Sequence, residues 1–147
     1  MKFSVLFFDG DCLLCSRVVQ WIIKNDTRGN IYFCTLEDGR NAGVDGLEND
    51  TVILWHLHKT YQKSKAVAQV LKLLGGFYRL VGYVISFFPL IISDKVYEFV
   101  AKNRYDWFGK KTNCLIPNPE WAYRILSLEN IDNMNLEKPN IENKDPL

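Results

Sequence analysis

Two cysteines separated by two residues, Cys12 and Cys15, are the residues of this sequence best suited to chemistry. At the start of a helix, this spacing brings two sulfur atoms within reach of a disulfide bond. A helix N-terminus also favours a thiolate, because it carries partial positive charge and unpaired N–H groups. In dithiol exchange one thiolate attacks a disulfide and the second cysteine resolves the mixed disulfide. We predict that Cys12, the more exposed thiol, attacks and that Cys15, on the apolar side of the helix, resolves.

Two carboxylates, Asp9 and Asp11, lie close to the first cysteine in the sequence. Both disfavour a thiolate at Cys12, because like charges that lie close together repel each other. Asp9 could also take the proton from the resolving thiol. A structural role for Asp9 at the end of a strand is equally open, whereas we predict that Asp11 caps the helix.

An apolar stretch followed by Asp9 and Asp11 also resembles the nucleophile motif of haloacid-dehalogenase-type phosphatases. In that family the first Asp is phosphorylated, the second acts as acid and base, and Mg²⁺ is bound. The family has Thr or Val shortly after the second Asp, but this sequence has Cys12 next, and no acidic pair follows a later predicted strand. Phosphatase chemistry is therefore an alternative and not the leading hypothesis.

Zinc binding and a redox-inert domain are two further alternatives. Cys12 and Cys15 could be half of a tetrahedral zinc site, and His56 and His58, on one face of a strand, could supply the other half. No second CxxC pair is present, so we expect neither a metal nor a cofactor. In the redox-inert alternative, both cysteines are unreactive core residues and the domain docks a partner through the surface of residues 77–92.

The predicted secondary structure places the cysteines between a strand and a helix. Residues 5–8 are typical of a short buried strand, and the apolar residues from Cys15 onward recur at helical spacing, which indicates a helix over about 13–25. A second strand at 31–35 completes a parallel βαβ unit. Strands at 51–57 and 61–63 are predicted to form a hairpin, and a helix at 66–74 follows, capped by Ser64. This order predicts an α/β fold with a thioredoxin-like core (β-α-β-β-β-α).

The C-terminal part is predicted to be a helical extension of the same domain. Residues 77–92 are strongly apolar, but Arg79 and Pro89 interrupt them, so we predict a buried or groove-lining helix, with a membrane-surface element as the alternative. Helices are predicted at 95–108, capped by Ser93 or Asp94, and at 118–128. We predict one domain over 1–128, with its helical extension at 77–128, and a flexible tail at 129–147.

Charge and cysteine usage restrict the function further. The 147 residues include 18 basic and 17 acidic side chains, so no basic excess indicates nucleic-acid binding. The N-terminus does not read as a secretory signal, and we therefore predict a cytoplasmic protein in which Cys34 and Cys114 are reduced thiols. We also expect no membrane contact.

Several motifs together resemble the DCC family of thiol-disulfide oxidoreductases, named for a D-x-x-C-x-x-C motif. That motif is here formed by Asp9, Cys12 and Cys15. A second match, at 94–109, resembles the signature D-x-V-Y-x-x-V-A-x-N-R-Y-x-x-F-G, and the residues at 64–66 and 114–117 resemble the family's S-x-A and its closing cysteine. The resemblance implies a thioredoxin-like fold and dithiol activity on a protein or small-molecule disulfide, with a reductant that it does not identify.

Three further residues are candidates for supporting roles. Better-understood thioredoxins carry a cis-proline before the third strand, but this sequence has none there, and Thr51 is predicted to approach the sulfur atoms instead. Helical spacing places Asn103 on an apolar face, where a buried amide needs partners. Asn103 and Arg104 either tie their helix to a loop, or Arg104 faces Asp9 or the dithiol and offsets the carboxylates.

Overall fold

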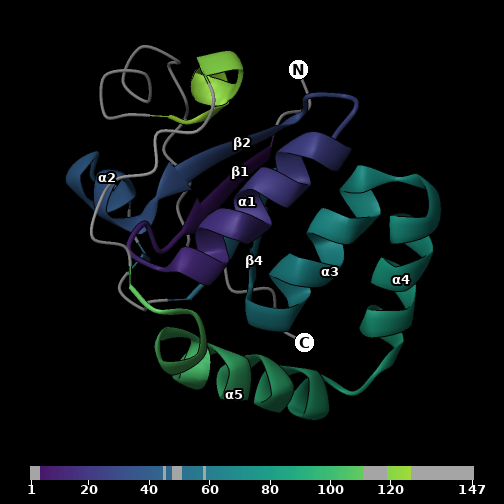
Figure 1. Ribbon diagram of the computed structural model, residues 1–147. Helices are drawn as coiled ribbons and strands as arrows, with labels where there is room; N and C mark the ends of the chain where they lie inside the picture. The colour runs from purple at the N-terminus through teal and green to yellow at the C-terminus, as the bar shows by residue number, and fades with distance from the viewer. Residues whose placement is uncertain (1–3, 45, 48–50, 58, 111–118, 127–147) are drawn as a thin grey trace.

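A computed structural model describes residues 4–44, 46–47, 51–57, 59–110 and 119–126 of the chain. Four strands form one mixed sheet in the order β2-β1-β3-β4, with α1 and α3 on one face and α2 on the other (Figure 1). The elements in chain order are β1 Ser4–Phe8, α1 Leu13–Asn25, β2 Ile31–Thr35, α2 Leu36–Asn41, β3 Ile53–His56, β4 Lys59–Gln62, α3 Lys63–Leu74, α4 Gly76–Phe87, α5 Leu90–Phe108 and the 3-10 helix η1 Pro119–Arg124.

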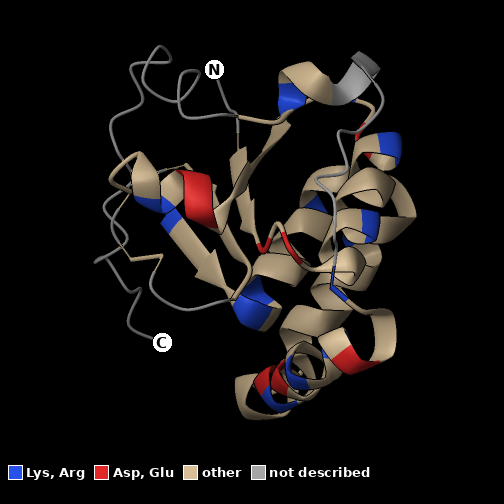
Figure 2. Ribbon diagram, turned by 60° about the vertical axis from the view of Figure 1, so that its left-hand side comes forward, with Lys and Arg blue, Asp and Glu red and all other residues tan. Residues whose placement is uncertain are grey.

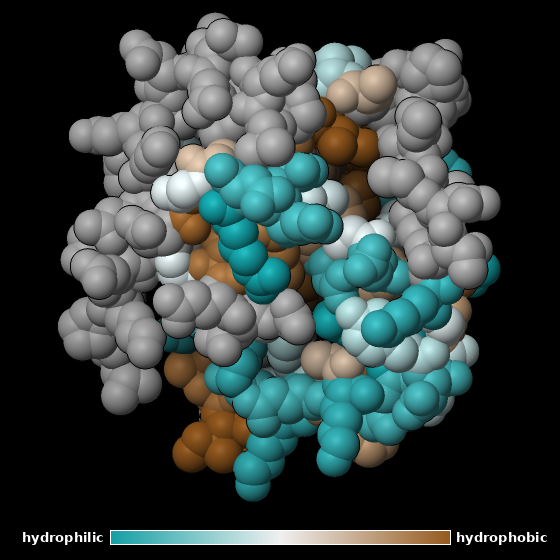
Figure 3. Space-filling view, turned by 90° about the vertical axis from the view of Figure 1, so that its left-hand side faces the viewer, coloured by the Kyte–Doolittle hydropathy of each residue, from teal (hydrophilic) through white to brown (hydrophobic). Residues whose placement is uncertain are grey.

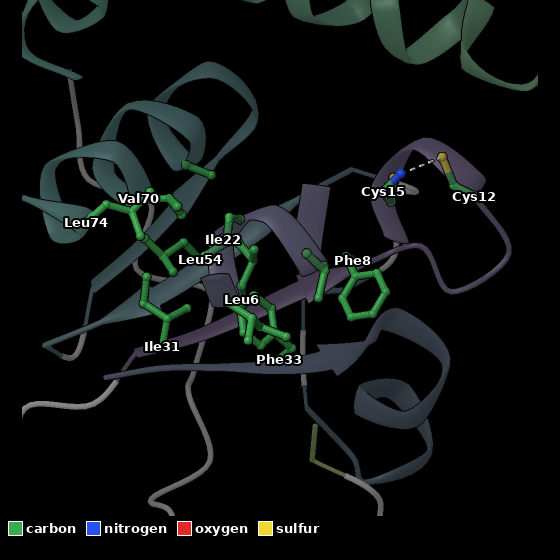
Figure 4. Close-up of a cluster of buried hydrophobic side chains, with 13 residues drawn as sticks. Leu6, Phe8, Cys12, Cys15, Ile22, Ile31, Phe33, Leu54, Val70 and Leu74 are labelled. Carbon is green, nitrogen blue, oxygen red and sulfur yellow. Dashed lines mark hydrogen bonds between the residues drawn. The ribbon is translucent and has the colours of Figure 1, made fainter. Parts of the chain in front are cut away.

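Strand β1 lies in the middle of the sheet and sends alternate side chains to its two faces. Leu6 and Phe8 pack with α1 and α3 on one face, whereas Val5 and Phe7 pack against α2 and the residues that follow it on the other. The first of these cores extends to the two cysteines at the start of α1 (Figure 4). The sheet therefore fixes the point from which the CxxC segment leaves β1.

The βαβ unit and the hairpin are confirmed. Strands β1 and β2 are parallel, with Ser4 opposite Ile31, and β3 pairs with β4 in antiparallel orientation. Helix α1 and strand β2 have the predicted bounds, whereas β4 lies earlier, at Lys59–Gln62 instead of 61–63. This mixed α/β architecture is consistent with the predicted thioredoxin-like fold, to which α2 adds a short helix between β2 and β3.

The predicted helix caps at Ser64 and at Ser93 or Asp94 are wrong. Helix α3 begins one residue before Ser64, after Gln62, and α5 begins at Leu90, directly after Pro89. Proline disfavours a helical conformation in the residue before it, so α4 ends at Phe87 and the next helix begins only after Pro89. The Ser64 hydroxyl instead donates a hydrogen bond to the Asp94 carboxylate, which joins α3 to α5.

The last described segment, residues 119–126, contacts the sheet at β2. Instead of the predicted helix at 118–128, a 3-10 helix is present at Pro119–Arg124. The Arg124 guanidinium is buried against the Asp26 carboxylate and donates from Nε to the Ile31 carbonyl at 3.1 Å. The predicted tail at 129–147, Cys114 and His58 lie outside the described residues.

The prediction of a buried helix at 77–92 is wrong, although Ile85, Ser86, Phe88 and Leu90 line a groove together with residues of β4 and α3. Helix α4 packs on the outer side of α3, away from the sheet, and Gly82 is its only buried residue (Figure 1). Phe87 is 91% exposed and Ile91 is 71% exposed. Among the described residues no single helix is long and apolar enough to cross a membrane; α4 and α5 reach that length and composition only as a pair, which bends by 112°.

Candidate functional site

The two cysteines occupy the first turn of α1, where the chain turns from the end of β1 into the helix. Cys12 is the N-cap residue, in an extended conformation, and its Sγ accepts a hydrogen bond from the Cys15 backbone N–H at 3.3 Å (Figure 4). Both thiols are free. The prediction that Asp11 caps the helix is therefore wrong, because a cysteine sulfur takes that place and Asp11 instead donates its backbone N–H to Asp9 Oδ1 at 3.0 Å.

Both cysteines are buried, and Cys12 is the more deeply buried of the two. Cys12 is 0% exposed and Cys15 is 9% exposed, so the prediction that Cys12 is the more exposed thiol is wrong. One contact that covers Cys12 is a backbone bridge to Lys110, just beyond the end of α5. No local sequence signal identifies this pairing, because the two residues are almost a hundred positions apart.

The surroundings of Cys15 disfavour its ionisation. Burial raises the pKa of Cys15 to about 12, and its hydrogen bond and charge interaction with Cys12 raise it as well. The Arg104 guanidinium acts in the opposite direction and lowers this pKa, whereas the Asp9 carboxylate raises it. At neutral pH Cys15 is therefore a protonated thiol whose ionisation depends on the nearby charges.

Asp9 and Arg104 form an ion pair beside the dithiol. Arg104 Nη2 lies 2.9 Å from Asp9 Oδ2, and Nη1 of the same guanidinium lies 3.9 Å from Cys15 Sγ. The Tyr105 hydroxyl donates a second hydrogen bond to Asp9 Oδ2. Asp9, Arg104, Cys12 and Cys15 are thus brought together, and Arg104 has the position expected in the alternative in which it faces Asp9 or the dithiol.

Tyr105 was not identified as a functional candidate from the sequence, although it lies within the second family motif. Its hydroxyl connects the end of α5 to Asp9, and burial together with the Asp9 hydrogen bond raises the pKa of Tyr105 to about 12. Tyr105 therefore remains a hydrogen-bond donor to the carboxylate over the physiological pH range.

Thr51 and Asn103 each make a hydrogen bond that the sequence did not predict. Thr51 donates to the Tyr97 hydroxyl at 3.0 Å, and the Val52 backbone N–H donates to the same hydroxyl at 2.9 Å. The Asn103 amide donates to the Phe99 carbonyl of its own helix at 2.7 Å, and the face of α5 that contains Phe99 is exposed. The prediction that Asn103 is buried is wrong, because Arg104 occupies the inward face.

An apolar cavity of about 290 Å³ adjoins Cys15 between α1, α3 and α5. Val52 closes it at the sheet, and Arg104 is the one charged residue among those that line it; the others include Leu14, Val18, Trp21, Val67 and Val100. On the opposite side of the molecule from α4, most described side chains at the surface are hydrophilic, and hydrophobic ones are visible between them and at the lower left edge of the view (Figure 3).

The predicted zinc alternative does not bring its residues together. His56 lies opposite Ser4 at the start of β1 and bonds its hydroxyl through Nδ1 at 2.7 Å, whereas the cysteines follow the other end of β1. His58 lies outside the described residues. Within the described ranges, His, Cys, Asp and Glu side chains form no group of three or more that could hold a metal ion, including around Asp9.

Comparison with known proteins gives a consistent family assignment. The family model "DCC1-like thiol-disulfide oxidoreductase" matches residues 6–110. The uncharacterized protein YuxK of Bacillus subtilis is 40% identical over 129 residues, which cover 83% of this chain and 93% of that protein. A DCC family protein of Arabidopsis thaliana, named as chloroplastic, is 31% identical over 119 residues, covering 77% and 69%. No solved structure matches.

Proposed function

The chain belongs to the DCC1-like thiol-disulfide oxidoreductase family, and we propose that it is an enzyme that reduces disulfides through Cys12 and Cys15. The observation that carries this proposal is the hydrogen bond from the Cys15 N–H to Cys12 Sγ at the start of α1. A backbone donor and the positive end of the helix both stabilise negative charge on that sulfur. Cys12 is therefore our proposed nucleophile and Cys15 the resolving cysteine.

The proposed reaction transfers two electrons from the dithiol to the substrate. The Cys12 thiolate attacks one sulfur of the substrate disulfide, forms a mixed disulfide and releases the other sulfur as a thiolate. Cys15 then loses its proton and attacks the Cys12 sulfur, which forms the Cys12–Cys15 disulfide and releases the second substrate thiolate. A low-molecular-weight thiol or a reduced dithiol protein then restores both thiols and is itself oxidised.

Arg104 and Asp9 are proposed to govern the second step. Negative charge develops on Cys15 Sγ when it loses its proton, and Arg104 Nη1, at 3.9 Å, stabilises this charge. Asp9 is proposed to position Arg104 and to moderate its charge rather than to act as the base, since its Oδ2 already accepts from Arg104 and Tyr105. This proposed role differs from both roles that the sequence left open for Asp9, a base for the resolving thiol and a structural residue at the end of the strand.

The burial of Cys12 supports a second candidate function, a redox-inert binding module, because a disulfide must reach the sulfur before exchange. Trapping separates the two. Purified Cys15→Ser protein, mixed with oxidised glutathione, should accumulate a mixed disulfide at Cys12, whereas Cys12→Ser should accumulate none. Cys34→Ser is the matched control, because Cys34 is equally buried and free but lies away from α1.

The outcomes of this experiment are distinct. A mixed disulfide at Cys12, followed by its release in the protein with both cysteines, supports the oxidoreductase. A folded protein in which neither cysteine reacts before denaturation would favour the inert module. A mixed disulfide at Cys15 in the Cys12→Ser protein, with none at Cys12 in the other variant, would reverse the proposed roles.

A further inference from the structure

Helix α4 presents apolar residues on the side that faces solvent. Gly82 faces α3 so closely that a Cβ there would lie 2.7 Å from the Ala68 carbonyl oxygen, and this contact fixes the inner side of the helix. Phe77, Leu80 and Val84 lie on the other side and are each more than half exposed. A surface helix of a soluble domain normally carries its polar residues there.

The exposed apolar residues continue around the bend between α4 and α5. We define the apolar corner as Leu80, Val84, Phe87, Phe88, Ile91 and Ile92, each at least 51% exposed. The corner lies in an uninterrupted run of fourteen residues, 80–93, without Asp, Glu, Lys or Arg. The two helices turn by 112° here, so the corner projects outward (Figure 1). An exposed apolar patch of this extent indicates an interaction surface.

The charges around the apolar corner favour an anionic surface as its partner. Arg79 precedes the uncharged run and Lys95 follows it closely, and both side chains are exposed. Residues 63–110 include eight Lys and Arg but three Asp and Glu, and of the eight only Arg104 is buried. The whole chain, in contrast, is nearly neutral, with 18 basic and 17 acidic residues. The positions of Lys and Arg along these helices are blue on the ribbon of Figure 2. Apolar side chains flanked by cations are the combination that binds anionic lipid.

From these observations we infer that the apolar corner inserts into the surface of an anionic lipid bilayer, so that the protein binds membranes peripherally. A convex corner suits a lipid surface, which needs no complementary shape. The sequence expectation of no membrane contact depended on the burial of residues 77–92, which the structure contradicts. This inference goes beyond the proposed dithiol chemistry and does not depend on it.

Membrane binding would also place the dithiol near the bilayer. Helix α5 begins in the apolar corner and ends beside the site, where Arg104 contacts Cys15. Thirteen residues separate Ile91 from Arg104, which corresponds to about 20 Å along a helix. Disulfides carried by proteins at the membrane surface would then lie within reach of the site.

Vesicle flotation of the full-length protein tests the inference. The wild-type chain should float with phosphatidylcholine vesicles that contain phosphatidylglycerol. Phe87→Ser/Ile91→Ser should lower the partition coefficient at least about tenfold, because two large side chains no longer enter the lipid. Tyr123→Ser/Leu57→Ser is the matched control, since these residues are 70% and 49% exposed but lie outside the corner. It should bind like the wild type.

Added salt, charge variants and the oligomeric state provide further tests of the inference. Binding should weaken with added salt and with Arg79→Ser/Lys95→Ser, because both reduce the attraction to phosphatidylglycerol. Absence of flotation in the wild type, or equal binding by the corner and control variants, would overturn the inference. So would a wild-type dimer that Phe87→Ser/Ile91→Ser converts to a monomer in sedimentation, since the corner would then contact a second copy of the chain.

Discussion

Replacing Arg104 should slow the resolving step of disulfide exchange without slowing the first attack. Arg104 Nη1 lies 3.9 Å from Cys15 Sγ, a separation at which opposite unit charges interact by about 4 kcal/mol at an effective dielectric constant of 20. The Asp9 carboxylate, 2.9 Å from the same guanidinium, offsets part of this, and a thiolate of higher pKa is also more nucleophilic. We expect Arg104→Met to raise the pKa of Cys15 further and to slow resolution about 10- to 100-fold.

Stopped-flow absorbance with an aromatic disulfide, dithionitrobenzoate, measures both steps. Attack by Cys12 releases the first coloured thiolate, and resolution by Cys15 releases the second. The pH profile of the second phase should move to higher pH in Arg104→Met and less so in Arg104→Lys, which keeps the charge without the planar guanidinium. Arg17→Met is the matched control, because Arg17 lies on α1 near the cysteines but is exposed.

Asp9→Asn distinguishes an electrostatic neighbour from a base. Asp9 raises the pKa of Cys15, so its neutralisation should lower that pKa and speed resolution at neutral pH. A base would give the opposite result, with accumulated mixed disulfide. Arg104→Met alone removes the ion-pair partner of Asp9 next to a buried position. The carboxylate is then less well paired, which destabilises the folded protein. Arg104→Met/Asp9→Asn removes both charges and should resolve at a rate between those of the single variants.

The charge of Arg104 should affect the second phase of the reaction and not the first. Unchanged resolution in a folded Arg104→Met protein would refute it, because the guanidinium would then contribute nothing to ionisation of Cys15. Equal slowing of both phases in every variant would refute it as well, since that pattern indicates general loss of structure.

Two further predictions concern stability. Burial raises the pKa of Cys34 from 9.0 to about 12, so its contribution is present below pH 9.0 and is lost as pH rises towards about 12; Cys34→Ala should reduce the alkaline loss of stability by up to about 1.4 kcal/mol per pH unit. Urea midpoints at neutral and alkaline pH check this, and identical pH dependence in both proteins would contradict it. Tyr97→Phe should cost about 1–3 kcal/mol, because the Val52 N–H loses its acceptor; an unchanged urea midpoint would show that water replaces the hydroxyl.

The elements that could be predicted from sequence depend on short-range patterns. The strand before Cys12, helix α1 and strand β2 follow from apolar runs, helical spacing and a polar turn, all within the first thirty-five residues. Their order also fixes the parallel pairing of β1 with β2, because a helix between two strands returns the chain in the same direction. The location of the dithiol at a strand-to-helix junction was therefore predictable.

The direction in which an apolar face points was not predictable in the same way. Periodicity groups residues on one side of a helix but does not say whether that side meets the core or the solvent. In α5 the apolar side with Phe99 is exposed, and the inward side carries Arg104 instead. From the sequence, the side with Phe99 was expected to face the core, and Asn103 was therefore predicted to be buried.

The features that determine the chemistry of the site arise from long-range contacts of α5. Tyr97 anchors this helix to the segment before β3 through Thr51 and Val52, and an ion pair from Lys63 Nζ to Glu98 Oε1, at 2.6 Å, anchors it to the start of α3. Arg104 is consequently held against Asp9 and Cys15 by contacts made one to two turns earlier in the same helix. The local CxxC motif therefore specifies the two cysteines. The pKa of Cys15, however, also depends on the contacts that hold α5, about ninety residues later in the chain, next to it.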